Sequence, residues 1–414
     1  MANTFKFVDW LTMESLRILV NKLETAQFFN TDYNKEFKRE FAVGETVRVK
    51  LPQRFLIRDG LGYSPQAIRR LNTTVVMDQI FGVDFEWDSV EKALKMERGD
   101  EDIRREYIDP AMAQIANEID SRAALFAYQN TNNLVGVLGT DPTTMTTFQQ
   151  ARGRLVDLAC PPKGSKGMII PTQINTSLVP TFTTTSSASF HPGPELTRQW
   201  KEGLIGTMSG FEWYESVNLY SHTAGTWAGA VTVNGAGQSG STLNINCTSG
   251  DTFKLGDIFS IANVNMVNPM SRRIVGTVTK QFVITQALTA TGSTETLNIS
   301  PAIEGPGSQY QNVDALAIDT AALTLFPGTS SPNGKSGIQA LALHRDAFAL
   351  VGVKLELPTA VEMSAQHRDP KTGLAVRFIR QFDAVQSKMV NRFDILCGFG
   401  KLYADNCAVR VQAG

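Results

Sequence analysis

Histidines and cysteines are the side chains of this sequence best suited to bind a metal or attack a substrate. The sequence has four of each, namely His191, His222, His344, His367, Cys160, Cys247, Cys397 and Cys407. Zinc sites built from local motifs use short, regular ligand spacings, and no histidine here has a second histidine or a cysteine at such a spacing. His344 lies within an apolar run, so we predict a buried core histidine and neither a ligand nor a base.

The cysteines lie far apart along the chain, except for the last two. A chain of 414 residues does not need disulfides to fold, so we predict reduced, packed thiols. Cys397 and Cys407 flank Gly398-Phe-Gly400 on strands predicted to be adjacent, where a role as small buried residues explains them better than redox chemistry.

Two further motifs could serve a ligand. Asn234-Gly-Ala-Gly-Gln-Ser-Gly240 contains G-x-G-x-x-G, but the residues that follow alternate like a strand, whereas a dinucleotide site needs a helix there. We predict a hairpin loop. Asp100, Glu101 and Asp102 could bind a hard cation, but further ligands and a turn glycine are missing, which favours a solvated approach to a helix. The sequence therefore predicts no catalytic residue, no cofactor and no metal.

Composition narrows the class of protein. With 42% apolar residues, 19% charged residues and a net charge of −1, the chain falls within the globular range. A dedicated nucleic-acid binder needs a strong basic excess, which this chain lacks. No window approaches the roughly 20 apolar residues of a membrane span, and the first residues lack a signal-peptide pattern. We expect synthesis and residence in the cytosol.

Two helices stand out among the elements that must position these residues. Asp9 can cap a helix that runs towards Gln27 with an apolar stripe of Leu16, Leu19, Val20 and Leu23. Asp109-Pro110 predicts the start of the longest helix, which runs to about Gln129. Its expected buried face consists of Met112, Ile115, Ile119, Ala123 and Phe126.

The rest of the chain alternates between helix and strand patterns. We predict helices over 145–159, from Pro194-Glu195 through Trp200, and over 344–350. We predict strands over 167–170, 210–214, 338–343, 374–379, 392–396, 399–403 and 407–411.

The segment from Thr223 to Tyr310 differs from its surroundings. It carries eight charges in 88 residues, about half the density of the whole chain, and short alternating runs separated by Gly, Ser, Thr and Asn fill it. We predict a small all-β domain inserted into a loop of a host fold.

Charge is unevenly distributed before the long helix. Between Arg48 and Arg70 six bases accompany a single acid, Asp59, and this stretch is predicted to be an extended loop or hairpin. Acids dominate the stretch that follows. We predict that these groups meet across subunits, the alternative being two ordinary solvated faces. The residues in question are Arg48, Lys50, Arg54, Arg58, Arg69 and Arg70 on one side, and Asp84, Glu86, Asp88, Glu91, Asp100, Glu101 and Asp102 on the other.

The order of these parts resembles that of the major capsid proteins of tailed bacteriophages, which share the Hong-Kong-97-type fold. It is most similar to the short-tailed-phage branch, which carries an immunoglobulin-like, telokin-type insertion domain. Three segments support the likeness: 253–262 with its Gly-Asp before a strand, 206–216 as a strand after a helix, and 393–411 as closing strands.

The resemblance implies an α+β phage capsid fold with the following parts. Residues 1–45 would be the N-arm, 46–80 the E-loop, 81–132 the P-domain with its spine helix, 133–222 and 311–370 the A-domain, 223–310 the inserted domain, and 371–414 the closing strands of the P-domain.

The resemblance also implies a function. The chain would be a structural major capsid protein, assembling in the host bacterial cytoplasm as hexamers and pentamers of an icosahedral shell. That shell would enclose double-stranded DNA without sequence-specific binding, with a scaffolding protein and a portal protein as partners and without a membrane. Near-zero net charge suits such a container, because a strongly basic wall would retain the DNA.

Three alternatives remain open at this point. An encapsulin-like nanocompartment has the same shell fold but encloses protein cargo. A cytosolic oligomeric enzyme with a β-rich insertion would be indicated by turnover dependent on His344 or Asp257. A β-rich surface or tail protein is disfavoured by the long helix and by the missing export signal.

Overall fold

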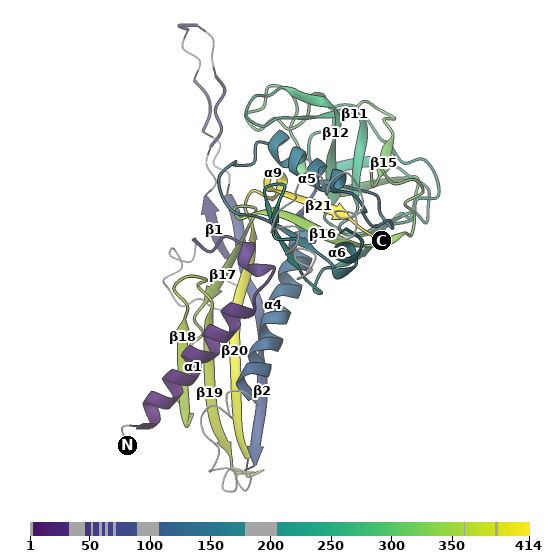
Figure 1. Ribbon diagram of the computed structural model, residues 1–414. Helices are drawn as coiled ribbons and strands as arrows, with labels where there is room; N and C mark the ends of the chain where they lie inside the picture. The colour runs from purple at the N-terminus through teal and green to yellow at the C-terminus, as the bar shows by residue number, and fades with distance from the viewer. Residues whose placement is uncertain are drawn as a thin grey trace, which may run out of the picture. The chain divides into compact units, whose positions relative to one another are not determined.

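The computed structural model describes residues 3–32, 46–50, 53–57, 60–62, 65–68, 72–88, 107–178, 205–359, 361–385 and 388–414. These residues form a mixed α+β structure that divides into two compact units (Figure 1). The first unit comprises Met1–Lys50, Asn72–Ala123 and Phe348–Leu402. The second comprises Leu51–Leu71, Ala124–Ala347 and Tyr403–Gly414. No described helix is long and apolar enough to cross a membrane.

The first unit is built on a six-stranded antiparallel sheet. Its path runs β1 (Thr46–Lys50), β2 (Asn72–Asp88), β20 (Lys388–Lys401), β19 (Ala375–Asp383) and β18 (Met363–Arg368), and β17 (Phe348–Val353) also pairs with β20. Helix α1 (Asn3–Lys22) lies across this sheet (Figure 1). Val75 and Met77 of β2 are fully buried, as the two-residue period of a strand requires.

Helix α4 (Asp109–Asn130) is the long helix that Asp109-Pro110 predicted, and it runs one residue past the expected end. Met112, Ile115, Ile119 and Ala123 are buried as predicted, whereas Phe126 is only partly buried. The helix also buries Asp120, whose carboxylate accepts the backbone N–H groups of Glu24 and Ala26 at 2.8 Å each. Burial raises the pKa of Asp120 to about 6, against the opposing effect of these hydrogen bonds.

The second unit contains a seven-stranded mixed sheet. Its path runs β3 (Leu134–Val135), β21 (Ala408–Gln412), β16 (Ser336–His344), β4 (Lys166–Ile170), β6 (Phe211–Glu215) and β5 (Thr207–Met208), and β7 (Ser221–Thr223) also pairs with β16. Helices α5 (Met145–Asp157), α6 (Thr172–Leu178) and α9 (Ala404–Cys407) complete this part.

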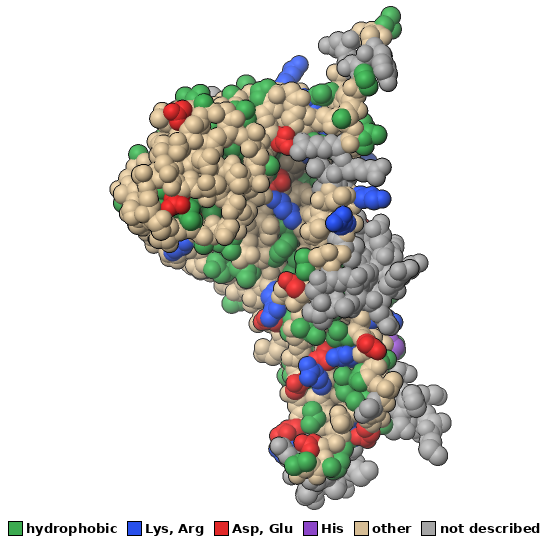
Figure 2. All heavy atoms as spheres, turned by 180° about the vertical axis from the view of Figure 1, so that it is seen from behind, with side chains coloured by type: hydrophobic (Ala, Val, Ile, Leu, Met, Phe, Trp, Pro, Cys, Tyr) green, Lys and Arg blue, Asp and Glu red, His purple; other side chains and the backbone are tan. Residues whose placement is uncertain are grey.

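A six-stranded antiparallel sheet forms most of the rest of the second unit, and its hydrophobic core also includes Leu134 of β3. Its order is β15 (Leu323–Leu325), β11 (Ile258–Val267), β12 (Ile274–Ile284), β14 (Thr294–Ile303), β9 (Gly240–Asn246) and β8 (Thr232–Val233). A separate pair consists of β10 (Thr252–Phe253) and β13 (Leu288–Thr289). Few charged side chains show on this β-rich part (Figure 2), in line with its composition.

Two predictions for this β-rich part can be compared with the structure. Residues 234–239 join β8 to β9, an antiparallel pair, so the glycine-rich motif is a hairpin loop as predicted. The antiparallel sheet continues past Tyr310, the predicted end of the inserted domain, because β15 pairs with β11, and Val313 and Phe326 belong to the same core. The sequence between Tyr310 and β15 lacks the alternation that would have shown this.

Several element predictions are wrong. Helix α1 begins at Asn3, so Asp9 lies inside it and is not its N-cap. The residues from Asn3 to Asp9 include no proline or glycine that would disfavour a helix there. Its end at Lys22 comes before Gln27 because a 3-10 turn (Ala26–Phe28) follows. The predicted helix over 344–350 is instead a turn after β16 that leads into β17, where pairing with β20 satisfies the backbone.

The predicted strands over 392–396 and 399–403 form one continuous strand, β20. Gly398 and Gly400 do not interrupt this strand. They allow β2 to approach closely, because a side chain at Gly398 would collide with the backbone of Val76 and one at Gly400 with the side chain of Val75. Cys397 lies in β20 and Cys407 in α9, so the two do not lie on adjacent strands. The helix predicted from Pro194 lies outside the described residues.

Candidate functional site

A buried group of ionisable side chains occupies the second unit, and Arg410 of β21 is its largest member. Its guanidinium has no exposed surface; it donates to the carbonyl of Thr131 at 2.9 and 3.1 Å and to that of Gly256 at 2.8 Å. It also lies 4.7 Å from the ring centre of Tyr128. Burial lowers the pKa of Arg410 to about 10, which leaves it charged at neutral pH.

The second half of this group is a hydrogen-bonded chain from an acid to a phenol. The Oδ1 atom of Asp257 lies 2.7 Å from Nε2 of His222, and Nδ1 of His222 contacts the hydroxyl of Tyr128. Asp257 also accepts the backbone N–H groups of Gly225 and Lys254. Burial lowers the pKa of His222, opposed by Asp257, and burial raises that of Tyr128. We name Tyr128, His222, Asp257 and Arg410 the buried polar cluster.

The cluster fastens the backbone and cannot perform chemistry on a substrate. An acid, a histidine and a hydroxyl joined by hydrogen bonds resemble a proton relay. A reacting group must reach its substrate, however, and His222, Asp257 and Tyr128 are at most 3% exposed. The partners of the cluster are instead backbone groups at the ends of segments, such as the N–H of Gly225 just after β7 and the carbonyl of Gly256 just before β11.

Gly256 shows how tightly this cluster is built. Its φ of +91° suits glycine, and a side chain there would overlap the hydroxyl of Tyr128. In the sequence, Gly256-Asp257 stands out as a Gly-Asp pair before a strand, and Asp257 as a residue on which an enzyme alternative could depend. The available signals were that Gly-Asp pair and an arginine within the apolar run Ala408-Val-Arg-Val411, but neither indicates its partners.

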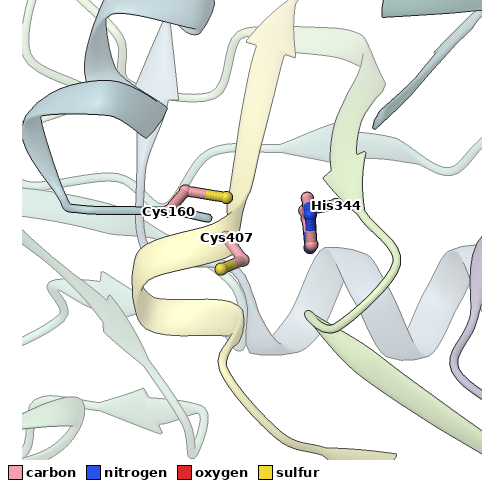
Figure 3. Close-up of side chains that lie close together, drawn as sticks. All are labelled: Cys160, His344 and Cys407. Carbon is pink, nitrogen blue, oxygen red and sulfur yellow. The ribbon is translucent and has the colours of Figure 1, made fainter. Parts of the chain in front are cut away.

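A second group brings together residues that sequence spacing kept apart. Cys160, His344 and Cys407 are all buried, and one ligand atom from each lies within 4.8 Å of the other two (Figure 3). The hydrogen bond between the side chains of Cys160 and Cys407 lowers the pKa of the Cys160 thiol and raises the pKa of the Cys407 thiol. His344 is buried as predicted, with both ring nitrogens hydrogen-bonded. The four cysteines are free thiols, as predicted.

The basic residues predicted to contact a neighbouring subunit lie in two described places. Arg48 and Lys50 are exposed on β1, where they pair in register with Thr74 and Asn72 of β2. Arg54 lies 5.8 Å from the ring centre of Tyr310 in its own chain, and burial lowers its pKa. Arg58, Arg69 and Arg70 lie outside the described residues.

The three acidic residues of that prediction that the structure describes have bases of their own chain beside them. Asp84 lies 3.6 Å from Arg392 and Glu86 lies 2.5 Å from Lys388, all four being partly exposed. The backbone of Asp88 also pairs in register with Lys388. Glu91, Asp100, Glu101 and Asp102 lie outside the described residues.

The stretch between β1 and β2 exposes apolar side chains. Gln66 holds it together by donating to the carbonyl of Leu56 at 2.5 Å and accepting from the N–H of Leu56 at 2.7 Å. The carbonyl of Ala67 accepts from the side chain of Gln309 at 2.9 Å. Four of its large apolar side chains nevertheless face solvent: Phe55, Ile57, Leu61 and Ile68 are 66, 96, 100 and 72% exposed. We name residues 53–68 the apolar arm.

Comparison with known proteins identifies the family. The family model described as "P22 coat protein - gene protein 5" matches residues 66–405. The chain belongs to the P22 coat protein family. It is therefore a structural, non-enzymatic major capsid protein of a tailed phage, and its place is the virion capsid. The family confirms the predicted capsid class and coat function and excludes the enzyme considered as an alternative.

Solved phage structures are similar to this P22-type coat protein at low identity. A structure from Mycobacterium phage Che8 is 13% identical, covering 94% of this chain and 90% of its own, with a TM-score of 0.46. "Capsid structure of the Cyanophage P-SCSP1u" is 12% identical with coverages of 91 and 85% and a TM-score of 0.42. The capsid of Helicobacter pylori bacteriophage KHP30 is 12% identical with coverages of 90 and 85% and a TM-score of 0.39. No curated protein sequence matches. The family assignment rests on the family model alone.

Proposed function

We propose that this coat protein assembles into a closed icosahedral shell of hexamers and pentamers around the double-stranded DNA of the phage. The observation that carries the proposal is the apolar arm of a coat protein. Four large apolar side chains in one short stretch are costly to leave in water, and a second subunit is the surface that a coat protein meets most often. Repeating one such contact around a closing rotation generates a finite particle.

Within this proposal the chain follows the Hong-Kong-97-type arrangement. Residues 1–45 serve as the N-arm, 46–80 as the E-loop, and 81–132 with 371–414 as the P-domain. Residues 133–222 serve as the first part of the A-domain. The extended sheet of β2 and β20 and the 22-residue helix α4 supply the stiff elements that a P-domain needs. Assembly takes place in the host bacterial cytoplasm with a scaffolding protein and a portal protein as partners.

Electron microscopy tests this proposal. The coat protein co-expressed with its neighbouring phage genes should yield closed icosahedral particles that package DNA when the packaging genes are present. Open sheets, helical tubes or soluble monomers as the sole products would contradict it. Closed particles that contain protein cargo and exclude DNA would favour the nanocompartment instead.

We also propose that the β-rich part is an inserted domain that stabilises the subunit and braces contacts between capsomers. Its two ends meet: the N–H of Ala224 donates to the carbonyl of Lys335 at 2.8 Å, and Thr223 of β7 pairs with Ser336 of β16. These contacts move the proposed domain limits to about 225–334, with 335–370 as the remainder of the A-domain.

Deletion of residues 225–334, with a short linker from Ala224 to Lys335, tests that role. The deletion leaves the pairing of β7 with β16 possible but removes Asp257 and the carbonyl of Gly256 from the buried polar cluster. We expect a marked loss of soluble subunit, measured against full-length protein made in parallel. Normal soluble yield together with normal particles would contradict both proposed roles.

Charge complementarity between subunits is the final part of the proposal. Arg48, Lys50, Arg54, Arg58, Arg69 or Arg70 of one subunit would contact acids of a neighbour between Asp84 and Glu106, giving the contact its register. Because Arg54 already lies beside Tyr310, the sharpest variant is Arg48→Glu with Lys50→Glu. We expect slower assembly and an altered dependence on salt in light scattering.

The matched control reverses two exposed lysines elsewhere in the first unit, Lys354→Glu with Lys371→Glu. It changes the net charge by the same amount without touching β1. Equal assembly rates and equal salt dependence for the two double variants would refute the charge contact.

A further inference from the structure

Cys160, His344 and Cys407 come from three distant parts of the sequence, and the topology of the second unit explains why they meet. Leu343 of β16 pairs with Ala408 of β21, so the next residues along this antiparallel ladder, His344 and Cys407, stand opposite one another. On its other side His344 pairs with Lys166 of β4. Cys160 precedes β4 by a short connection and follows α5, whose last turn it closes through its N–H to the carbonyl of Leu155.

The hydrogen bonds of His344 define which nitrogen is available. Nε2 lies 3.1 Å from the carbonyl of Lys163, which can only accept, so Nε2 carries the proton. Nδ1 accepts the N–H of Asp346 at 3.2 Å and therefore carries the lone pair, and a metal ion bound at Nδ1 would replace this hydrogen bond. A ring N–H held by a backbone carbonyl, with the other nitrogen as donor of a lone pair, is the usual arrangement of a metal-binding histidine.

We propose that Cys160, His344 and Cys407 bind one Zn²⁺ ion. Two thiolates and one imidazole are the donor set that zinc prefers, and two thiolates cancel the charge of the ion in a buried site. In a tetrahedral zinc site the sulfurs are about 3.8 Å apart, as zinc–sulfur bonds of about 2.3 Å require. The three ligand atoms lie within 4.8 Å of one another, so side-chain movements of about 1 Å close the site.

Asp346 supplies the fourth ligand or orients a water in that position. Its Oδ2 atom lies 3.6 Å from Nδ1 of His344, the nitrogen with the lone pair, and its side chain is 42% exposed. A carboxylate on the solvent side gives the ion a route into an otherwise buried site. Bound zinc would link the segment after α5, the end of β16 and the helix α9 through covalent coordination, in addition to the hydrogen bonds that already join them.

Metal analysis and cobalt titration of the full-length subunit test the site. Protein purified under reducing conditions without chelator should contain about one zinc per chain. After chelator treatment, added Co²⁺ should produce the charge-transfer absorbance of thiolate–cobalt bonds, and Zn²⁺ should abolish it. We expect Cys160→Ser and Cys407→Ser each to remove that absorbance or to weaken zinc affinity at least tenfold, and His344→Asn to weaken it as well.

Cys247→Ser is the matched control, since Cys247 is a free thiol of the same unit outside the proposed zinc site. It should bind cobalt and zinc like the parent. The wild-type measurements also decide the matter if a cluster variant fails to fold. The proposal is overturned if wild-type protein binds no stoichiometric zinc or cobalt, if binding survives loss of both cluster cysteines, or if the two thiols are found joined as a disulfide.

Discussion

Replacing Arg410 by methionine removes the charge of the buried polar cluster and keeps a long, flexible side chain in its place. The carbonyls of Thr131 and Gly256 lose three hydrogen bonds from a charged donor, each contributing about 1.5–3 kcal/mol. Against this sum of roughly 5–9 kcal/mol stands the desolvation cost of the buried charge, several kcal/mol. We therefore expect Arg410→Met to destabilise the second unit by about 3–5 kcal/mol.

Hydrogen exchange measures this effect locally, which matters because a chain of two units need not unfold in one step. The N–H of Gly256, bonded to Ile284, and that of Arg410, bonded to Asn133, report on the cluster. We expect their exchange to accelerate roughly 150- to 4000-fold, the equivalent of that destabilisation. Amides of β19 and β20 in the first unit serve as an internal reference that should change little.

Arg152→Met is the matched control, because Arg152 is exposed on α5 in the same unit. It should change stability by no more than about 0.5 kcal/mol. The reasoning would be refuted if Arg410→Met matched this control, since the guanidinium would then contribute nothing beyond its bulk. Arg410→Lys distinguishes charge from geometry: one ammonium cannot reproduce the forked contact with two carbonyls, so we expect an intermediate loss.

The other predictions concern a buried acid and a constrained glycine. Asp120 has a folded-state pKa of about 6, above its pKa in the unfolded chain, so its contribution to stability is greatest below about pH 4 and is lost as pH rises through 6. The variant Asp120→Asn should remove this pH dependence from urea unfolding curves. An unchanged pH profile of stability would contradict the assignment. Gly256→Ala forces a methyl group onto Tyr128 and should lower the free energy of unfolding by at least about 2 kcal/mol, measured by thermal unfolding. Gly250→Ala, at φ +96° but in open space, should lower it by about 1 kcal/mol. Equal losses of stability in the two variants would mean that backbone strain alone acts.

Local patterns predicted those elements whose structure depends on local sequence. Helix α4 followed from Asp109-Pro110 and its apolar period, and the hairpin loop between β8 and β9 followed from glycines before an alternating run. Elements that depend on a distant partner were missed. Residues 348–353 form a strand because β20 lies beside them, and Gly398 and Gly400 stay within a strand because β2 approaches closely.

The candidate sites were hidden for the same physical reason. Cys160, His344 and Cys407 meet through the pairing of β16 with β21 and β4, and a search for ligands at fixed sequence spacing cannot find a site made by sheet register. Arg410 and Asp257 likewise find their partners across the sequence. The acids Asp84 and Glu86 have in-chain bases beside them because β2 and β20 pair in register, which the sequence did not predict.

The use made of polar side chains in this coat protein explains why a search for catalytic groups failed. In an enzyme, an acid, a base or a nucleophile faces the substrate, and other side chains hold that group in position. Here Asp120 and Asp257 accept backbone N–H groups and Arg410 donates to backbone carbonyls, and all three are buried. Buried polar groups add little net stability compared with apolar packing, but each penalises an arrangement in which its partner is absent. A shell subunit must present the same surfaces in every copy, and such penalties favour a single arrangement of the chain.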